Sequence, residues 1–176
     1  MRERTVEEMV KHRAGLKLSV AALAMMSVLA SPVRAFASDG DILKNVQSRQ
    51  EVKRVVSNVS SEMVESYVEE PLELASDTLE SLYGISPEIY KSFYGEFSSI
   101  ENTLDTFIIV QTSDKEVENL FNDYIFKMES SSSLVDTKQI KNAQVASIGE
   151  YTIFSMLGSK EESAEALNIA KDILKK

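Results

Sequence analysis

The 176-residue chain carries 28 acidic and 19 basic side chains, for a formal net charge of −9, and 43% of its residues are hydrophobic. It has no cysteine, and its single histidine is His12. Catalytic systems that pair Ser or Cys with His, and zinc sites built from His or Cys, are therefore excluded for the rest of the chain. The acidic balance argues against binding to the phosphates of nucleic acids.

The first 37 residues have the pattern of a secretory signal peptide. A basic start is followed by a short apolar run, Leu16 to Ala30, whose one charge is Lys17. Pro32 ends this apolar helix, because proline has no N–H to donate and its ring clashes with the preceding turn. The basic segment also holds three glutamates, so we expect translation to start at Met9, which gives an acid-free segment, rather than at Met1.

The expected cleavage site follows the apolar run. Ala35 and Ala37 bracket the residue between them in an A-x-A pattern, so the mature chain would begin at Ser38. Such a chain would be secreted or held at the cell surface. The alternative is an uncleaved N-terminal membrane anchor, although the uninterrupted run Leu18–Ala30 is shorter than the ~20 residues that span a bilayer.

Residues 38–176 have the size of a single domain. We divide them into a helical N-terminal part, 38–71, and a core, 72–176. They hold 13 of the basic and 25 of the acidic residues, which favours solubility and disfavours adhesion to an anionic surface.

Helical periodicity dominates the start of this domain. Apolar residues spaced three and four apart predict a helix over Asp41–Ser57, interrupted at Ser48–Gln50, with a weaker continuation over Asn58–Glu70. The next pattern predicts a short helix over Leu72–Tyr83, which Gly84 closes in the left-handed conformation.

Aromatic residues gather between positions 83 and 97. Ser86 and Pro87 are typical of a helix start, and the following spacing predicts a helix with its rings on one face. The whole set is a candidate surface for a peptide or a glycan, although rings at helical spacing favour packing in the core. Its members are Tyr83, Tyr90, Phe93, Tyr94 and Phe97.

The second half of the chain alternates strands and helices. The unbroken apolar run at 107–110, within Thr103–Thr112, predicts a strand covered on both faces. Ser113 and Glu116 predict a capping box that opens a helix with an apolar stripe over residues 117–128. The serine run at 130–133 predicts a loop.

A hairpin and a last helix complete the pattern. Gly149 and Glu150 join two predicted strands, because a glycine at the first position suits a tight hairpin turn. Ser159 and Glu162 form a second capping box. The helix that they open runs to the end of the chain, with its apolar residues facing the core.

The element order is helices, then strand–helix–strand–strand–helix. A right-handed crossover would lay the hairpin in the same sheet as the first strand. The predicted fold class is α+β, a small and mainly antiparallel sheet packed with helices on one face. Because the run at 107–110 is apolar throughout, we expect the second face to be covered too, by the N-terminal helices.

Three segments and the C-terminal helix share their order and spacing with a known family. The segments are LESLYGISPEIYKSF, FIIVQTSDKEVENLF and GEYTIFSML, within roughly Leu72–Leu174. Leu82–Glu88 matches a recurrent Leu-Tyr-Gly-Ile-x-Pro-Glu run, and Gly149 precedes a strand that starts with an aromatic residue. In these features the chain resembles the bacterial domain of unknown function 4358 family. The resemblance implies a small secreted or surface-attached protein with no established activity.

The chain departs from that family in two respects. Many members are lipid-anchored through a cysteine, and this chain has none. Members often carry a segment with Tyr and Pro after the middle helix, where this chain has its serine run. Lipid anchoring and any property of that segment are therefore not expected here.

No motif in the chain indicates a reaction. It has no G-x-S-x-G, no Ser-x-x-Lys, no G-x-G-x-x-G and no EF-hand loop. We therefore expect a non-catalytic extracytoplasmic domain, without cofactor or metal, that binds a protein or envelope component and no nucleic acid.

Two alternatives remain open at this point. One is a carboxylate-dependent enzyme acting on glycans, for which no acid pair stands out. The other is weak cation binding by Glu65, Glu69, Glu70 and Glu73, whose helical spacing is more typical of a solvated face.

Overall fold

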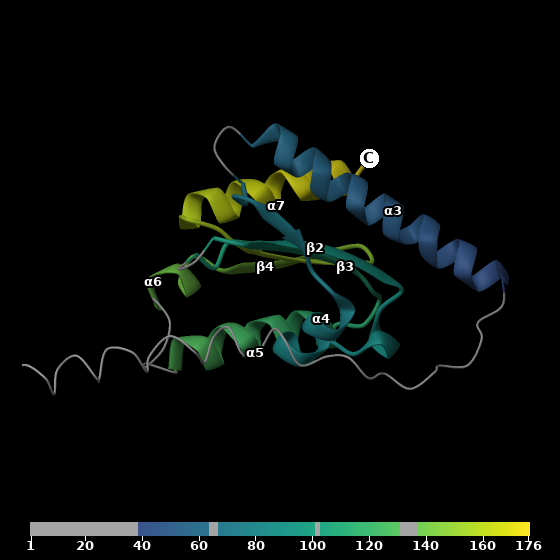
Figure 1. Cartoon of the computed structure of the whole chain (residues 1–176), viewed down its shortest axis with the longest axis horizontal. Helices are drawn as coiled ribbons and strands as arrows, with labels where there is room; N and C mark the ends of the chain where they lie inside the picture. The colour runs from purple at the N-terminus through teal and green to yellow at the C-terminus, as the bar shows by residue number, and fades with distance from the viewer. Residues whose placement is uncertain (1–38, 64–66, 101–102, 131–136) are drawn as a thin grey trace, which may run out of the picture. The chain divides into compact units, whose positions relative to one another are not determined.

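The computed structural model describes residues 39–63, 67–100, 103–130 and 137–176 (Figure 1). All of them lie within the compact unit Ala37–Lys176. The predicted cleavage-site residues Ala35, Ala37 and Ser38 fall outside the described residues. Within the described ranges, no helix combines the length and the apolar character that crossing a bilayer requires.

A five-stranded sheet forms the centre of this unit. Its order is β1-β2-β3-β5-β4, and every neighbouring pair is antiparallel. The α+β class and the antiparallel sheet are therefore confirmed. The strands are β1 (Pro71–Glu73), β2 (Ser92–Ser98), β3 (Thr106–Gln111), β4 (Gln144–Ile148) and β5 (Tyr151–Met156).

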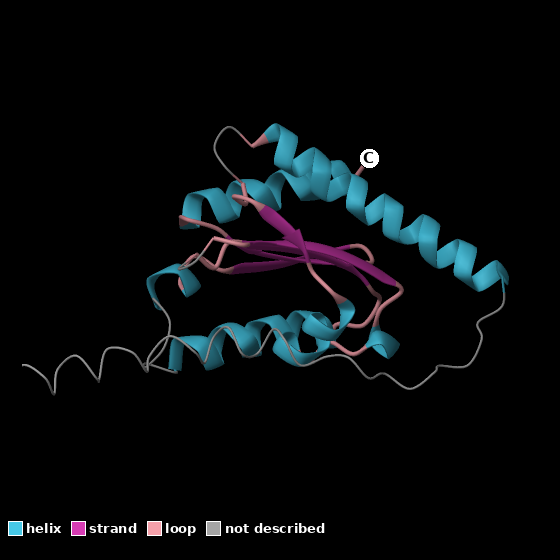
Figure 2. Ribbon diagram, viewed as in Figure 1, coloured by secondary structure: helices cyan, strands magenta, loops and turns pink. Residues whose placement is uncertain are grey.

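Helices cover both faces of the sheet (Figure 2). Helices α3 (Asp39–Glu62) and α7 (Lys160–Leu174) pack on one face, and α4 (Ser76–Tyr83) and α5 (Glu116–Ser130) pack on the other. A short helix, α6 (Thr137–Ile140), precedes β4. The expectation that both faces are covered is thus confirmed, with α7 joining the N-terminal helix on its face.

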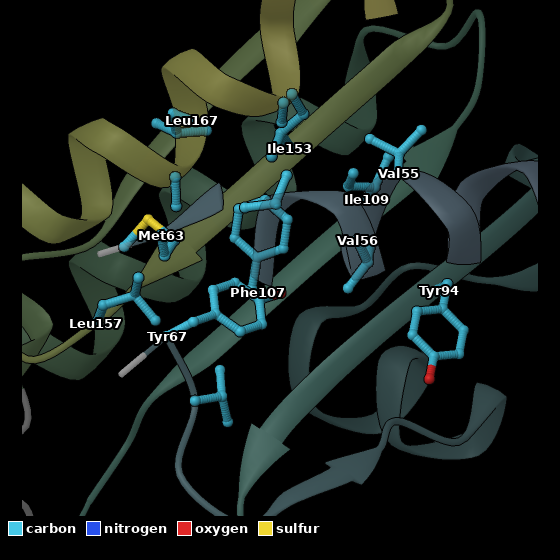
Figure 3. Packing of buried hydrophobic residues seen from close by; sticks show 14 of the residues in the cluster. Val55, Val56, Met63, Tyr67, Tyr94, Phe107, Ile109, Ile153, Leu157 and Leu167 are labelled. Atoms are coloured by element: carbon cyan, nitrogen blue, oxygen red, sulfur yellow. The ribbon is translucent and has the colours of Figure 1, made fainter. Parts of the chain in front are cut away.

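Strand β3 lies at the centre of the packing. Its four apolar residues, 107–110, are fully buried and alternate between the two faces. Phe107 and Ile109 face α3 and α7 and form the α3-side core (Figure 3). Ile108 and Val110 face α4 and α5 and form the α5-side core. A continuous apolar strand is required because neither face of the sheet is solvated.

Three local signals act as the sequence predicts. Gly84 ends α4 with φ 73° while its N–H donates to the Glu80 carbonyl, and Gly149 turns the β4–β5 hairpin with φ 56°. Ser159 and Glu162 make both hydrogen bonds of the capping box at the start of α7. Each signal depends on short-range geometry alone.

The N-terminal helix α3 begins two residues before the predicted Asp41 and ends at Glu62, within the predicted continuation over Asn58–Glu70. It runs without a break through Ser48–Gln50, because Ser48 lies on its inward side and bonds to polar groups of the sheet instead of breaking the helix. The predicted helix over Leu72–Tyr83 begins later, at Ser76, since Pro71–Glu73 pair with β2 and the Leu74 N–H donates to the Gly95 carbonyl over 2.8 Å.

The predicted aromatic helix after Pro87 is wrong. Only Pro87–Ile89 is helical, as one 3₁₀ turn, and residues 92–98 form strand β2. Strand pairing on both sides outweighs the accidental helical spacing, and the period of two sends Phe93 and Tyr94 to opposite cores. Gly95 allows the close approach, because a Cβ there would lie 3.0 Å from Cγ1 of Ile108.

The capping box predicted at Ser113 is also wrong. Helix α5 begins at Glu116, whose N–H donates to the Asp114 carboxylate over 2.9 Å. The Asp114 N–H in turn donates to the Thr112 hydroxyl over 2.9 Å. Asp114 rather than Ser113 therefore caps this helix, while Ser113 is exposed.

Candidate functional site

The five aromatic residues of the candidate surface do not lie together. Tyr94 belongs to the α3-side core, while Tyr83 and Phe93 are buried in the α5-side core. Tyr90 and Phe97 are half-buried against that second core. The structure therefore distributes this set over both faces of the sheet.

Polar side chains instead meet where α3 crosses β2. Ser92, Tyr94 and Glu96 alternate along β2 and so point to the same side of the sheet, toward α3. They take part in two polar clusters. The first, which we call the charged edge, consists of Arg49, Lys53, Glu73, Tyr94 and Glu96.

Two carboxylates face each other in the charged edge. Glu73 of β1 and Glu96 of β2 are directly opposite in the strand register, an arrangement that places their Cβ atoms about 5 Å apart. Glu73 forms ion pairs with Arg49 and with Lys53, the latter over 3.5 Å. Glu96 accepts a hydrogen bond from the Tyr94 hydroxyl over 3.2 Å.

The two carboxylates differ in their surroundings. Glu73 is 43% exposed and is held by both cations. Burial raises the pKa of Glu96, and the charge of Glu73 adds to this, while the Tyr94 hydrogen bond and the charge of Lys53 act in the opposite direction. Burial and the two carboxylates together raise the pKa of the Tyr94 hydroxyl. Within the described ranges no Lys or Arg lies within ion-pair distance of Glu96.

The two cations of the charged edge also contact aromatic rings. The Lys53 Nζ lies 4.9 Å from the Tyr94 ring centroid, and the Arg49 guanidinium lies 5.9 Å from that of Phe93. Phe93 belongs to the opposite face of the sheet from α3. The Arg49 guanidinium, which also pairs with Glu73, therefore places a charge beside β2 at this edge of the sheet.

The second cluster joins α3 to the end of the sheet. The Gln111 Oε1 accepts from the hydroxyls of Ser48 and Ser92, the latter over 2.9 Å. Its Nε2 donates to Glu150 over 3.0 Å, and Glu150 pairs with Lys91 over 2.5 Å. Hydrogen bonds from Lys91 and Gln111 lower the pKa of Glu150. Each member has a partner, so this cluster fixes α3 and the hairpin turn to the sheet.

The described residues offer little for a metal or an enclosed ligand. No group of three or more His, Cys, Asp and Glu side chains converges among them. A hollow at the surface is lined by Gln47, Gln50, Glu51 and Arg54, which all come from α3. It does not include the charged edge.

The acidic residues predicted to share a helical face are arranged differently. Glu69 and Glu70 lie in a bend and Glu73 in β1, so the predicted helix over these positions is wrong. Glu65 lies outside the described residues. Glu70 has a φ of 44°, which fits a tight turn into β1 and not a helix.

Sequence reasoning missed the charged edge entirely. Arg49 and Lys53 are four apart on a helix, which is a detectable signal for a shared face. Glu73 and Glu96 become neighbours only through the β1–β2 register, and neither strand had been predicted. No local pattern could have paired them.

A family model described as Domain of unknown function (DUF4358) matches residues 65–157. The chain belongs to this family. The DUF4358 match covers all five strands together with α4, α5 and α6, and it includes Glu73, Tyr94 and Glu96. Helices α3 and α7 lie outside it. No curated protein and no solved structure matches the chain.

Proposed function

We propose that this DUF4358 protein is an exported, non-catalytic domain that binds a protein with a basic surface on the outer side of the membrane. The observation that carries the proposal is Glu96. The Glu96 carboxylate is half-buried, and the cluster around it is half-exposed. Among the described residues, no Lys or Arg forms an ion pair with it.

The opposed carboxylates of the charged edge destabilise the folded state, and the fold does not require them. Like charges directly opposite on neighbouring strands are destabilising, and burial further disfavours the ionised form of Glu96. Sites that depart from the best choice for folding are frequently sites of function. A Lys or Arg of a partner would favour the ionised form of Glu96 and offset its lost hydration.

The composition of the surface supports a protein partner. Arg is enriched where proteins bind one another, and the Arg49 side chain is 49% exposed. The excess of 25 acidic over 13 basic residues in residues 38–176 attracts a basic partner over a longer range.

Export is tested by intact mass and N-terminal sequence of the native protein, measured separately in culture fluid and membranes. We expect a species that begins at Ser38 in the fluid. An uncut species confined to membranes would instead indicate a tethered domain, and an uncut species in the cytosol would contradict export.

The binding surface is tested by co-purification from native cells with the native chain and two variants. We expect a specific protein to be recovered with the native chain and with Asp123→Asn, an exposed change on α5. Recovery should fall at least about tenfold with Glu96→Gln, which removes one interfacial charge. Equal recovery with Glu96→Gln would contradict the assignment of this surface.

A carboxylate enzyme acting on glycans is the second candidate. The specific observation in its favour is that Glu73 and Glu96 are neighbours in different environments, as acid and base pairs are. Against it, Arg49 and Lys53 already bind Glu73, and the hollow that the structure describes lies elsewhere. Release of sugars from cell-wall glycans by the native chain, lost with Glu96→Gln, would favour the enzyme.

A further inference from the structure

Among the residues that the structure describes, nothing gives the outer strand β4 the usual protection of a sheet edge. It pairs with β5 on one side and is the last strand of the sheet on the other. Its sequence, Gln-Val-Ala-Ser-Ile, has no charge and no proline, the features that natural proteins place on exposed edges. The opposite edge has both, in Pro71 and Glu73 of β1, and Arg49 also covers β2 there.

The hairpin geometry determines which main-chain groups of β4 are free. Two residues connect the strands, so Ile148 and Tyr151 form the hydrogen-bonded pair next to the turn. Alternate residues bond to β5 in the same way, namely Ala146 and Gln144. The N–H and C=O groups of Val145 and Ser147 therefore point away from the sheet, ready to pair with another strand.

The side chains of β4 are fixed to the helices on either face. The Ser147 hydroxyl donates to Glu118 of α5 over 2.6 Å, and the Gln144 amide donates to the Lys160 carbonyl at the start of α7 over 2.8 Å. Val145 packs on the α5-side core and Ala146 on the α3-side core. A rigid edge loses little conformational entropy when a strand is added.

We propose that β4 pairs with β4 of a second copy of this chain, antiparallel and centred on Ala146, to form a homodimer with one continuous ten-stranded sheet. In this register Val145 of each copy exchanges two hydrogen bonds with Ser147 of the other. The two Ala146 residues then form the non-hydrogen-bonded pair on the two-fold axis. Two-fold self-pairing of one surface patch is the commonest way for a protein to form a dimer.

The charge distribution favours a second copy over a foreign strand. Two copies that each carry an excess of acidic residues repel each other, so they meet most easily where the paired strands themselves carry no charge. Residues 144–148 are all uncharged. At each end of the paired strands, the exposed Lys141 of one copy approaches the hairpin turn that holds Glu150 of the other, which places opposite charges together twice in the dimer.

The native protein, in the N-terminal form that the mass measurement defines, should show a mass that rises reversibly with concentration in sedimentation equilibrium. A five-residue strand pair is small compared with stable interfaces, so monomer and dimer should exchange. Ser147→Pro removes one N–H that points away from the sheet and leaves the β4–β5 hydrogen bonds intact. Edge strands tolerate a proline at such a position. We expect this substitution to abolish the dimer.

Ser147→Ala is the matched control, because it removes the same hydroxyl and keeps the N–H. It should dimerise as the native chain does. Lys141→Glu, outside the strand, should weaken the dimer and do so more at low salt. A native chain that stays monomeric at every concentration would overturn the proposal, as would a folded Ser147→Pro variant that dimerises normally.

A single introduced cysteine tests the register, because the chain has none of its own. Ala146→Cys lies on the two-fold axis at a Cα separation of about 4.5 Å, which a disulfide spans, so oxidation should give a covalent dimer. Gln144→Cys would lie about 13 Å from its counterpart and should not cross-link. Cross-linking at 144 and not at 146 would overturn the proposed register, and cross-linking at neither position would overturn the pairing.

Discussion

At the scale of single residues, the two carboxylates of the charged edge have different partners. Glu73 and Glu96 are opposite each other, yet both cations bind Glu73, whereas Glu96 accepts a hydrogen bond from a tyrosine hydroxyl. The energetic consequence falls on Glu96, whose ionised form is disfavoured by burial and by the neighbouring carboxylate. Its effect on stability should therefore depend on pH.

We expect Glu96→Gln to stabilise the fold at neutral pH, by on the order of 0.5 kcal/mol. A carboxyl with a raised pKa favours folding below its unfolded value, and this contribution is lost as the pH rises through the folded pKa. Glutamine is neutral throughout and still accepts from Tyr94. The gain should thus be present at pH 7 and vanish near pH 4, as measured by urea unfolding at both values.

Glu73→Gln provides the matched comparison for this substitution. It relieves the same repulsion, but it also removes the ion pairs with Arg49 and Lys53. We therefore expect no net gain at neutral pH. A stabilisation by Glu73→Gln as large as that by Glu96→Gln would show that the repulsion alone determines the effect.

At the scale of elements, the sequence predicted what local chemistry determines. The buried strand at 107–110, the hairpin at Gly149, the glycine end of α4 and the capping box at Ser159 all depend on residues within a few positions of one another. The fold class followed from their order. These features need no knowledge of the rest of the chain.

The failures at β1, at β2 and at the charged edge share one physical cause, which is pairing over a distance. Residues 92–98 match a helical period and still form a strand, because β1 and β3 pair with them on both sides. Strand β1 has three residues and was not predictable alone. The charged edge depends on this same pairing, so it could not be predicted even though Arg49 and Lys53 share a helical face.

The start of α5 gives a direct test of a corrected prediction. Asp114→Ala removes the carboxylate that accepts from the Glu116 N–H, and we expect a loss of about 1 kcal/mol in the free energy of unfolding. Ser113→Ala should change it by less than about 0.5 kcal/mol, because Ser113 is exposed. Urea unfolding measures both, and the reverse order would restore Ser113 as the cap.

At the scale of the molecule, one sheet supports two cores. Phe107 and Ile109 of β3 belong to one core, and Ile108 and Val110 to the other. The DUF4358 match includes the helices of the α5-side core, whereas α3 and α7, which cover the other face, lie outside it. The sheet nevertheless needs both layers, since four consecutive fully buried apolar residues cannot be left half-solvated.

Because both cores share β3, the domain should unfold as one cooperative unit. Phe121→Ala empties a fully buried site in the α5-side core and should cost about 3–5 kcal/mol. Val56→Ala, in the α3-side core, should cost about 1–3 kcal/mol. In each variant we expect a single urea transition that far-ultraviolet and near-ultraviolet circular dichroism report at the same midpoint.

Phe126→Ala is the control on the same helix as Phe121, because the Phe126 side chain is 70% exposed. It should leave the midpoint of the urea transition unchanged within experimental error. This result would exclude a general effect of losing an aromatic ring from α5. Separate transitions after Val56→Ala, with the α5-side core surviving, would contradict the shared-sheet argument. That result would mean that the layer matched by DUF4358 folds by itself and that α3 and α7 add a separable cover to it.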